Sequence, residues 1–495
     1  MKLWEKLTNS NLLTVAEGLD EFVKKAESRQ KKKFARVAER YYRSEHDIKN
    51  VRILYFDDHD NLVEDKYAAN THIPHSFFTE QVDQKTQYLL ANGIEVTAED
   101  EQLQALLDDY INEDFQLFID EMVEGASIKG VEYAYARTNA DDRLSFQTSD
   151  FLQTDTVFND YNQEVAVIRR YSETVFKNDK EVKLTYAEVY TPENVKFFVS
   201  EDEKPYQVDR AREPNPQGHS LAYRDDGELL ERSYGRIPFY RLANNRLESS
   251  DLVPIKALID DYDNMSSFLS NNLQDYDKPI YVVSGYQGES LDKIRQNIKG
   301  KGMLRVGAPN TSGDLDVKTY QIPYEARKEK MAMDKEAIYK FGMAFDSSQS
   351  GDGNITNIVI KSRYSLLDLK CNKIEPRLRA MLKWCLELIL QDIHRKGEGN
   401  YSLDDVEINI ERNMLFNEND TATKELTEAQ TKQTLIAALV SAAPYLTDDE
   451  ITKQICEYFE LDYEEVLAQL ETEDEEVLER EDDVPEDDEV AEGNP

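Results

Sequence analysis

Two histidines three residues apart, His72 and His75, have a spacing that could hold a metal ion. The sequence around them supplies no cysteine and no obvious third ligand, which a zinc site needs. A calcium loop is the second candidate, because residues 57–61 are Asp-Asp-His-Asp-Asn. Counted from the first aspartate, however, position 6 is Leu62 instead of glycine and position 12 is Ala68 instead of glutamate. We therefore expect structural or surface histidines and a solvated hairpin turn.

The glycines at 351 and 353 could form a phosphate-binding loop, but no Gly-Lys-Ser or Gly-Lys-Thr follows them to neutralise a nucleotide. A hydrolase elbow, a zinc-protease motif and a dinucleotide-binding fingerprint are also missing from the sequence. Asp260, Asp261 and Asp263 could form the metal cluster of a nuclease, yet consecutive helical residues point about 100° apart. We expect these aspartates on an exposed helix face, and we expect no catalytic residue, cofactor or metal.

The chain has 495 residues and 59 Lys and Arg against 99 Asp and Glu, which gives a formal charge of −40. Its 40% hydrophobic content predicts a folded protein, and its length predicts about three domains. So acidic a chain is unsuited to a static grip on DNA, which depends on Lys and Arg, although transient contact stays open. Three scattered cysteines and the lack of a signal peptide or spanning segment predict a reducing, cytoplasm-like compartment and no membrane partner.

These residues need elements to position them, and the hydrophobic pattern predicts helices over the first 45 residues and a mixed region up to about residue 240. Within that region, strands are expected at residues 51–56, 165–168, 184–189 and 196–199, helices at 77–90 and 115–123, and a turn at 191–194. A long helix should follow over residues 252–273, with Ser250 and Asp251 as its cap.

A small module should lie between two long helices. It contains strands at 279–285, 302–306 and 315–322 and a short helix at 291–298, and the second long helix covers 324–342. After a flexible loop, a third helix should be kinked by Pro376. Its apolar stripe consists of Tyr364, Leu367, Cys371, Ile374, Leu378, Met381, Cys385 and Leu388. A strand at 406–410 is expected to return to the first sheet.

This order of parts resembles the portal proteins of tailed bacteriophages, in particular those of long-tailed phages of Gram-positive hosts. Three segments carry the resemblance: residues 40–48, where Ser44 replaces a usual glycine and predicts a slightly altered turn; residues 77–94; and residues 234–285. The last includes Tyr-Gly-Arg-Ile-Pro-Phe at 234–239 and Leu-Ile-Asp-Asp-Tyr-Asp at 258–263. The resemblance as a whole covers most of residues 38–393.

The resemblance implies an α+β fold class with the parts of a portal ring subunit. These parts are an N-terminal helix plus an α+β wing (1–250), a stem helix (251–278), a small α/β clip (279–323), a second stem helix (324–343), a tunnel loop (344–358), a long kinked helix with the wing's return strand (359–417), a helical crown (418–470) and a disordered acidic tail (471–495). The repulsion among acids supports disorder in the tail.

The resemblance also implies a ring, usually of twelve subunits, at one capsid vertex of the virion, made in the host cytoplasm. The implied partners are further copies of the chain, double-stranded DNA held weakly and without sequence preference, the terminase large subunit, a head-completion adaptor, and the major capsid and scaffolding proteins. An acidic wall would let DNA slide, although the charge also fits plain solubility. The apolar helix stripes would meet neighbouring subunits.

The resemblance places DNA contacts on two sets of residues. The tunnel loop supplies Ser347, Ser348, Gln349, Ser350, Gly351, Asp352, Gly353 and Asn354, and the clip supplies Lys293, Arg295, Lys299, Lys301 and Arg305 for DNA, terminase or adaptor. The clip cations also fit an ordinary exposed helix face. The alternatives are an acidic intracellular scaffold or adaptor, whose tail mimics DNA or binds a basic partner, and a metal-dependent nuclease.

Overall fold

The computed structural model describes residues 1–24, 27–56, 59–65, 68–138, 142–177, 180–223, 229–276, 280–284, 314–318, 323–346, 357–412, 434, 453 and 463. The chain divides into two compact units. One comprises Met1–Gly351 and Lys361–Met414, and the other comprises Asp352–Ile360 and Leu415–Pro495. In the second unit, residues 357–360, 434, 453 and 463 are described and all are helical.

The first 45 residues are largely helical, as predicted, and contain α1 (Leu3–Leu7), α2 (Leu12–Lys24) and α3 (Glu27–Tyr42). Leu7, Val15 and Leu19 of α1 and α2 are fully buried against an antiparallel sheet of order β10-β9-β8-β7-β6. Its strands are β6 (Thr154–Phe158), β7 (Glu164–Lys177), β8 (Lys180–Tyr190), β9 (Val195–Glu201) and β10 (Gln207–Val208). The predicted turn joins β8 to β9 and is closed by the Thr191 N–H, which donates to the Asn194 carbonyl at 2.9 Å.

A second antiparallel sheet has the order β13-β4-β5. It contains β4 (Val131–Thr138), β5 (Leu144–Ser149) and β13 (Phe239–Ala243), and a separate hairpin contains β11 (Ser220–Tyr223) and β12 (Leu229–Arg232). Another hairpin, β1 (Leu54–Phe56) with β2 (Leu62–Glu64), follows the short helix η1 (Asp47–Asn50). The pairing of β1 with β2 agrees with the predicted hairpin, although β1 is shorter than predicted and residues 57 and 58 of the predicted turn lie outside the described residues.

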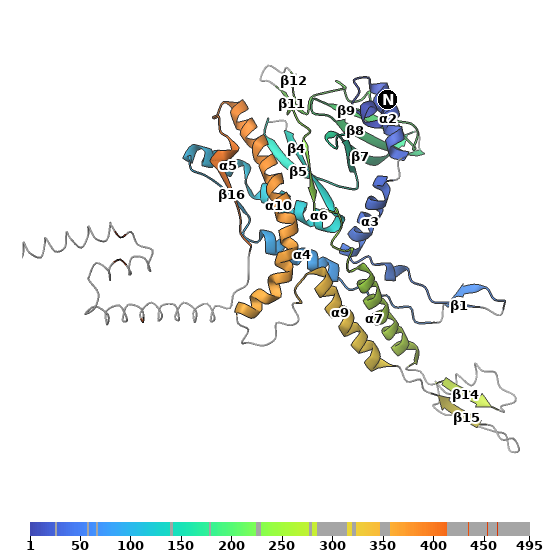
Figure 1. Ribbon diagram of the computed structural model, residues 1–495. Coiled ribbons are helices and arrows are strands. Elements are labelled where there is room, and N and C mark those ends of the chain that lie inside the picture. Colours follow the sequence, from blue (N-terminus) through green and yellow to red (C-terminus); the bar gives the residue numbers. More distant parts are fainter. Residues whose placement is uncertain are drawn as a thin grey trace, which may run out of the picture. The chain divides into compact units, whose positions relative to one another are not determined.

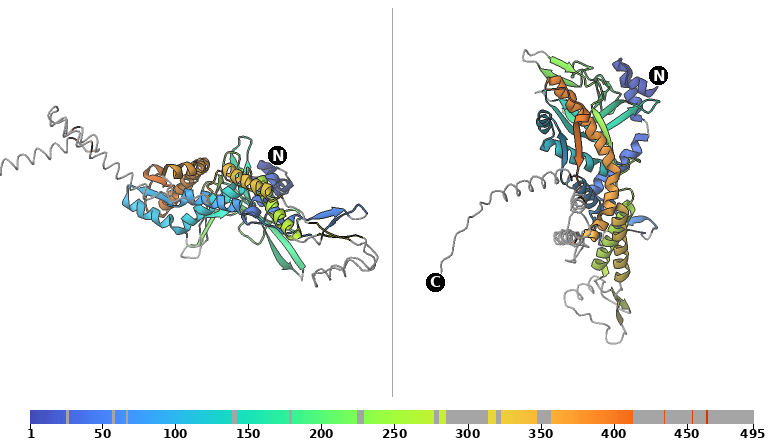
Figure 2. Two further views of the ribbon diagram at one scale, coloured as in Figure 1. Left: turned by 90° about the horizontal axis from the view of Figure 1, so that it is seen from below. Right: turned by 60° about the vertical axis from the view of Figure 1, so that its left-hand side comes forward.

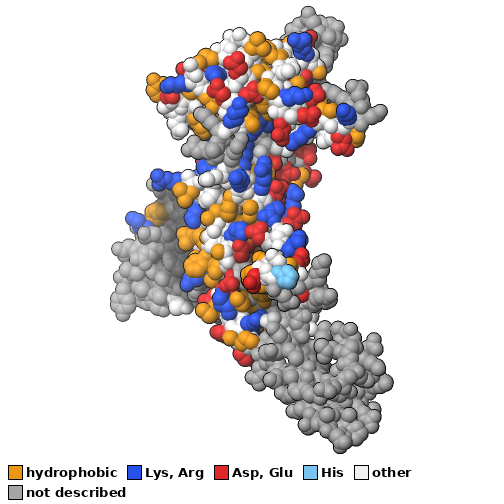
Figure 3. All heavy atoms as spheres, turned by 90° about the vertical axis from the view of Figure 1, so that its right-hand side faces the viewer, with side chains coloured by type: hydrophobic (Ala, Val, Ile, Leu, Met, Phe, Trp, Pro, Cys, Tyr) orange, Lys and Arg blue, Asp and Glu red, His pale blue; other side chains and the backbone are white. Residues whose placement is uncertain are grey.

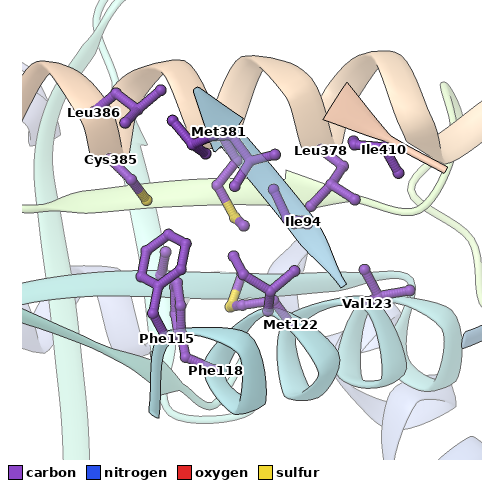
Figure 4. Packing of buried hydrophobic residues seen from close by; sticks show 14 of the residues in the cluster. Ile94, Phe115, Phe118, Met122, Val123, Leu378, Met381, Cys385, Leu386 and Ile410 are labelled. Carbon is purple, nitrogen blue, oxygen red and sulfur yellow. The ribbon is translucent and has the colours of Figure 1, made fainter. Parts of the chain in front are cut away.

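The largest hydrophobic core forms around the long helix α10 (Asn357–Lys396). Met381, Leu378 and Cys385 of α10 face Phe115, Phe118 and Met122 of a second helix, with Ile94 and Ile410 between them (Figure 4). Besides β4, β5 and β13, the other elements of this core are α4 (Phe77–Leu90), β3 (Ile94–Ala98), α5 (Glu101–Tyr110), α6 (Glu113–Lys129), η3 (Leu403–Asp405) and β16 (Val406–Ile410).

Two predictions about this region need correction. We expected the apolar stripe of α10 to meet neighbouring subunits, but its residues from Leu367 to Leu388 are buried in the chain's own core. The strand at 406–410 does return to the first domain, as expected, but β16 pairs there with β3 in a two-stranded sheet of its own, with Ile408 opposite Val96. Helix α10 continues through Pro376, and the kink stays a prediction.

Two long helices, α7 (Lys256–Tyr276) and α9 (Tyr324–Gly342), lie side by side (Figure 1). The bounds of α9 confirm the predicted helix at 324–342. Between the two helices, β14 (Ile280–Ser284) pairs with β15 (Asp314–Lys318), which confirms the strand at 279–285 and part of that at 315–322. The predicted helix at 291–298 and strand at 302–306 lie outside the described residues.

The start of α7 differs from its prediction. We expected Ser250 and Asp251 to cap the helix, but residues 251–255 form turns and the helix begins at Lys256. Pro254 disfavours helical backbone at the residue before it, which explains the later start. With antiparallel sheets and helices packed on one another (Figure 2), the described residues form the predicted α+β fold.

Candidate functional site at the base of the α7–α9 helix pair

The residues for which we predicted DNA or terminase contacts lie outside the described part of the chain. This holds for tunnel-loop residues 347–354 and for Lys293, Arg295, Lys299, Lys301 and Arg305 of the clip. The structure does describe the base of the two helices that lead to these segments. There, α7 and α9 meet α3, α4 and α10, and several ionisable side chains are buried.

The three aspartates considered as a nuclease cluster point to three different partners. Asp260 accepts hydrogen bonds from Tyr41 and from Lys256, and Asp261 pairs with Lys330 on α9. Asp263 is fully buried, so the expected exposed face is wrong for this residue. In the described ranges, we find no group of three His, Cys, Asp or Glu side chains that could hold a metal ion.

Asp263 joins two histidines that are far from it in the sequence. Its Oδ2 lies 2.6 Å from Nδ1 of His46, and its Oδ1 accepts hydrogen bonds from the backbone N–H and Nδ1 of His75 at 2.9 and 2.8 Å. His46 is itself buried and stacks on Tyr41. Because a buried carboxylate needs such partners, Asp263 fixes α7 against the segments that precede η1 and α4.

The histidines are structural, as predicted, but their partners were missed. Nε2 of His72 lies 2.8 Å from the carbonyl oxygen of Val51, and His75 binds Asp263. One signal in the sequence could have revealed the burial of Asp263: it follows Ile259 by four residues and therefore lies on the apolar face of the helix. The pairing with His46 leaves no local signal, since 217 residues separate the two.

A second buried network joins α4, the approach to α7, and α10. Nζ of Lys85 donates to Ser127 Oγ at 2.8 Å, to Asn244 Oδ1 at 2.5 Å and to Asp251 Oδ2 at 2.9 Å. Lys370 of α10 lies 3.4 Å from the same carboxylate and donates to the carbonyl of Gly342, the last residue of α9. Asp251 is therefore an anchor for several elements instead of the predicted helix cap.

In this network, interactions with neighbouring charges oppose the effect of burial on the pKa values. Burial by itself would raise the pKa of Asp251, but the nearby charges of Lys370 and Lys85 and a hydrogen bond from Asn244 lower it to about 2. Burial lowers the pKa of Lys370, and the charge of Asp251 opposes that effect only in part. The network therefore holds the carboxylate ionised at neutral pH and fixes the end of α9 on the body of the protein.

Close packing completes the junction between α9 and α4. A Cβ atom added at Gly342 would overlap Oε1 of the buried Gln81, so any larger residue there requires the Gln81 side chain to move. Phe77 and Phe78 of α4 share one hydrophobic cluster with Ile255, which directly precedes α7, with Ile259 of α7 and with Ile338 of α9. Apolar packing and buried charges thus hold both long helices on the α+β body.

The segment that resembles the early portal motif ends α3 in a left-handed residue. Ser44 has φ +58°, its N–H donates to the Tyr41 carbonyl, and the Glu45 N–H donates to the Arg40 carbonyl. These two bonds form a Schellman motif, in which glycine is the usual left-handed residue. We expected an altered turn at Ser44, but the backbone adopts the conformation that a glycine favours.

The fold and this junction define an α+β protein that carries a firmly anchored pair of long helices. A family model described as phage portal protein, SPP1 Gp6-like, matches residues 20–480. The chain therefore belongs to this family of phage portal proteins. It is similar to the portal protein of Bacillus phage SPP1, with 27% identity over 369 residues that cover 74% of this chain and 71% of that protein.

A second relative is the portal protein of Clostridium phage phiCD119. It is 27% identical over 208 residues, which cover 41% of this chain and 45% of that protein. In the part of the chain that the structure describes, no helix is long and apolar enough to cross a membrane.

Proposed function

We propose that this chain is the subunit of a ring, of twelve copies, that forms a channel for double-stranded DNA at one vertex of the capsid. DNA enters through it during packaging and leaves through it during ejection. The family match over residues 20–480 carries this proposal, and the anchored helix pair supports it, because a channel wall needs helices held at a fixed angle. The role is structural and needs no catalytic residue or cofactor.

The parts of the chain take the corresponding roles in this proposal. Residues 1–250 and 359–417 form the wing, α7 and α9 the stem, and residues 279–323 the clip, which offers its five cations to DNA, terminase or the head-completion adaptor. Residues 344–358 form the tunnel loop, residues 418–470 the crown and residues 471–495 a disordered acidic tail. Capsid and scaffolding proteins surround the wing at the portal vertex of the virion.

The net negative charge of the chain favours passage of DNA through the channel and disfavours tight binding of DNA. The total is −40, although Lys and Arg are interspersed with Asp and Glu on the described surface in Figure 3. Such a surface offers few continuous cationic tracks on which phosphates could settle. Neutral side chains such as Ser347 and Asn354 would then contact the duplex without reading its bases.

Charge reversal in the clip tests the proposed contacts. We expect Lys293→Glu, Arg295→Glu and Lys299→Glu together to lower DNA packaging at least tenfold while rings still form, because the acidic partner would meet repulsion. Packaging is measured as nuclease-protected DNA per capsid, and ring formation by electron microscopy. A control variant with Lys180→Glu and Lys204→Glu, both exposed, the first in β8 and the second in the loop between β9 and β10, should package normally. Normal packaging by the clip variant would disprove the contact.

A further inference from the structure

The β1–β2 hairpin presents an apolar face that the described part of the chain leaves exposed. Phe56 pairs with Leu62 across the strands and Leu54 with Glu64, so the three apolar side chains lie on one face. Their exposed fractions are 69% for Phe56, 57% for Leu62 and 48% for Leu54. An isolated two-stranded hairpin is marginally stable in water, so we expect another surface to pack against this face.

The base of this hairpin is nevertheless held in place. His72 and Asn70 both bind the carbonyl oxygen of Val51, and the Thr71 N–H donates to Asn271 of α7 at 2.7 Å. The hairpin projects from this base beyond α7 (Figure 1). The segment that joins its strands carries three aspartates in the sequence, and β2 adds Glu64. It is thus an anchored, projecting element with an apolar face and acidic surroundings.

A pocket elsewhere on the chain has the complementary character. It has a volume of about 510 Å³ and lies between the loop before α7, the end of α9 and the middle of α10. Five Lys and Arg residues line it against the single acid Asp251. Two large apolar side chains at its edge are exposed, Leu247 by 78% and Phe341 by 56%.

The outer cations of this pocket lack acidic partners within the described ranges. Asp251 compensates the buried Lys85 and Lys370, whereas Arg246, Lys373 and Arg377 form no ion pair with any described carboxylate. In a chain of charge −40, such cations attract the acids of another molecule. The exposed Leu247 and Phe341 add an apolar contact that a nucleic acid backbone or the acidic tail would not use.

We propose that the β1–β2 hairpin of one subunit docks into this pocket of the next subunit. The proposal rests on the ring of the proposed function, because every copy in a ring presents both surfaces. A hairpin on one copy meeting a pocket on the next gives a head-to-tail interface, which is the kind that closes into a ring. Apolar side chains cover one another. Asp60 approaches Arg246, Lys373 and Arg377, together with Glu64, which in the single chain pairs with Arg52 at 3.1 Å.

Disulfide trapping tests this interface in the full-length protein. Cys456 is first replaced by serine, and Phe56→Cys and Leu247→Cys are then made in separate chains; Cys371 and Cys385 are buried. When the two chains are mixed, assembled and oxidised, we expect covalent dimers on a non-reducing denaturing gel. Neither chain alone should give them, because each carries one half of the contact. Leu13→Cys, on a leucine of 70% exposure, replaces Phe56→Cys in the matched control and should give no dimer.

The outcomes separate this interface from the proposed function. Rings seen by electron microscopy without covalent dimers would overturn the interface and leave the ring intact. An unmodified chain that never forms rings would contradict the proposed function and the interface with it. Charge reversal supplies a second readout: Arg246→Glu with Lys373→Glu should reduce ring yield at least tenfold, and Asp60→Lys with Glu64→Lys in the same chain should restore it. Unchanged yield in the pocket variant would also overturn the interface.

Discussion

At the scale of single residues, Glu132 shows how burial sets pH dependence. This β4 residue is 3% exposed, and its carboxylate accepts the N–H of Phe151 at 2.8 Å and pairs with Lys129. Burial raises its pKa from 4.5 to about 7, against the opposing charge of Lys129. The folded protein therefore binds an extra proton between these pH values, so the Glu132 contribution to stability decreases as pH rises through that window.

Glu132→Gln should remove this dependence. The amide oxygen can still accept the Phe151 N–H, and the amide does not ionise in this pH range. Relative to the variant, the wild type should lose about 3 kcal/mol of unfolding free energy between pH 4.5 and pH 7, as measured by urea denaturation at a series of pH values. Glu113→Gln, at an exposed residue of α6, should leave the curve unchanged. Parallel curves for wild type and Glu132→Gln would contradict the assignment.

Ser44 offers a second prediction at this scale. A left-handed conformation costs an L-residue about 1 kcal/mol, and Ser44 adopts it at φ +58°. Ser44→Gly should therefore raise the unfolding free energy by up to about 1 kcal/mol, less whatever the lost contact between Ser44 Oγ and Ser76 Oγ contributes. Ser44→Ala removes the same contact without relieving the backbone, so it should be destabilising. Denaturation curves in which glycine is no better than alanine would rule out backbone strain here.

At the scale of elements, the packing of α9 on α4 depends on the close approach of Gly342 to Gln81. Gly342→Ala would place a methyl group against Gln81, which is fully buried, and should cost about 2 kcal/mol by overpacking. In a Gln81→Ala background, the same substitution should cost less than about 1 kcal/mol, because the obstructing side chain is gone. Unfolding free energies of the four proteins give the coupling. Equal costs in both backgrounds would show that Gln81 is not the obstacle.

The sequence predicted elements where local pattern decides them. Helices at 77–90 and 324–342 were predicted with the bounds that the structure shows, since their apolar period and turn residues are local. The role of Asp251 as a buried anchor was not predictable, because its partner Lys85 is 166 residues away in the sequence. The stripe on α10 identified a helix, but periodicity cannot distinguish a neighbour within the chain from one in another subunit.

The sequence predicted only part of the candidate site, because many of its contacts join residues that are far apart in the chain. The resemblance pointed to tunnel-loop and clip residues, which lie outside the described ranges and stay predictions. The buried contacts that hold the helix pair, such as Asp263 with His46, link segments that no short motif joins. Burial of Asp263 was accessible from its position on the apolar helix face, whereas the identity of its partner required the fold.

At the scale of the whole molecule, the proposed portal function depends on ring closure. The apolar stripe of α10 is used inside the chain, so the surfaces between subunits must lie elsewhere, and the exposed hairpin and the cationic pocket are the surfaces that we propose. Head-to-tail contact of two different surfaces leads either to a closed ring or to an open filament. Assembly state is therefore the property that most directly separates a portal from an acidic scaffold.

The most direct test is the mass of the purified full-length protein by light scattering, together with negative-stain images of the same sample. We predict rings with a central opening and a mass of about 690 kDa, twelve times the 57.3 kDa chain, or a closely related multiple. The measurement should be repeated across a range of salt concentrations, because charged interfaces weaken with salt. Persistent monomers or dimers under all these conditions would contradict the portal assignment.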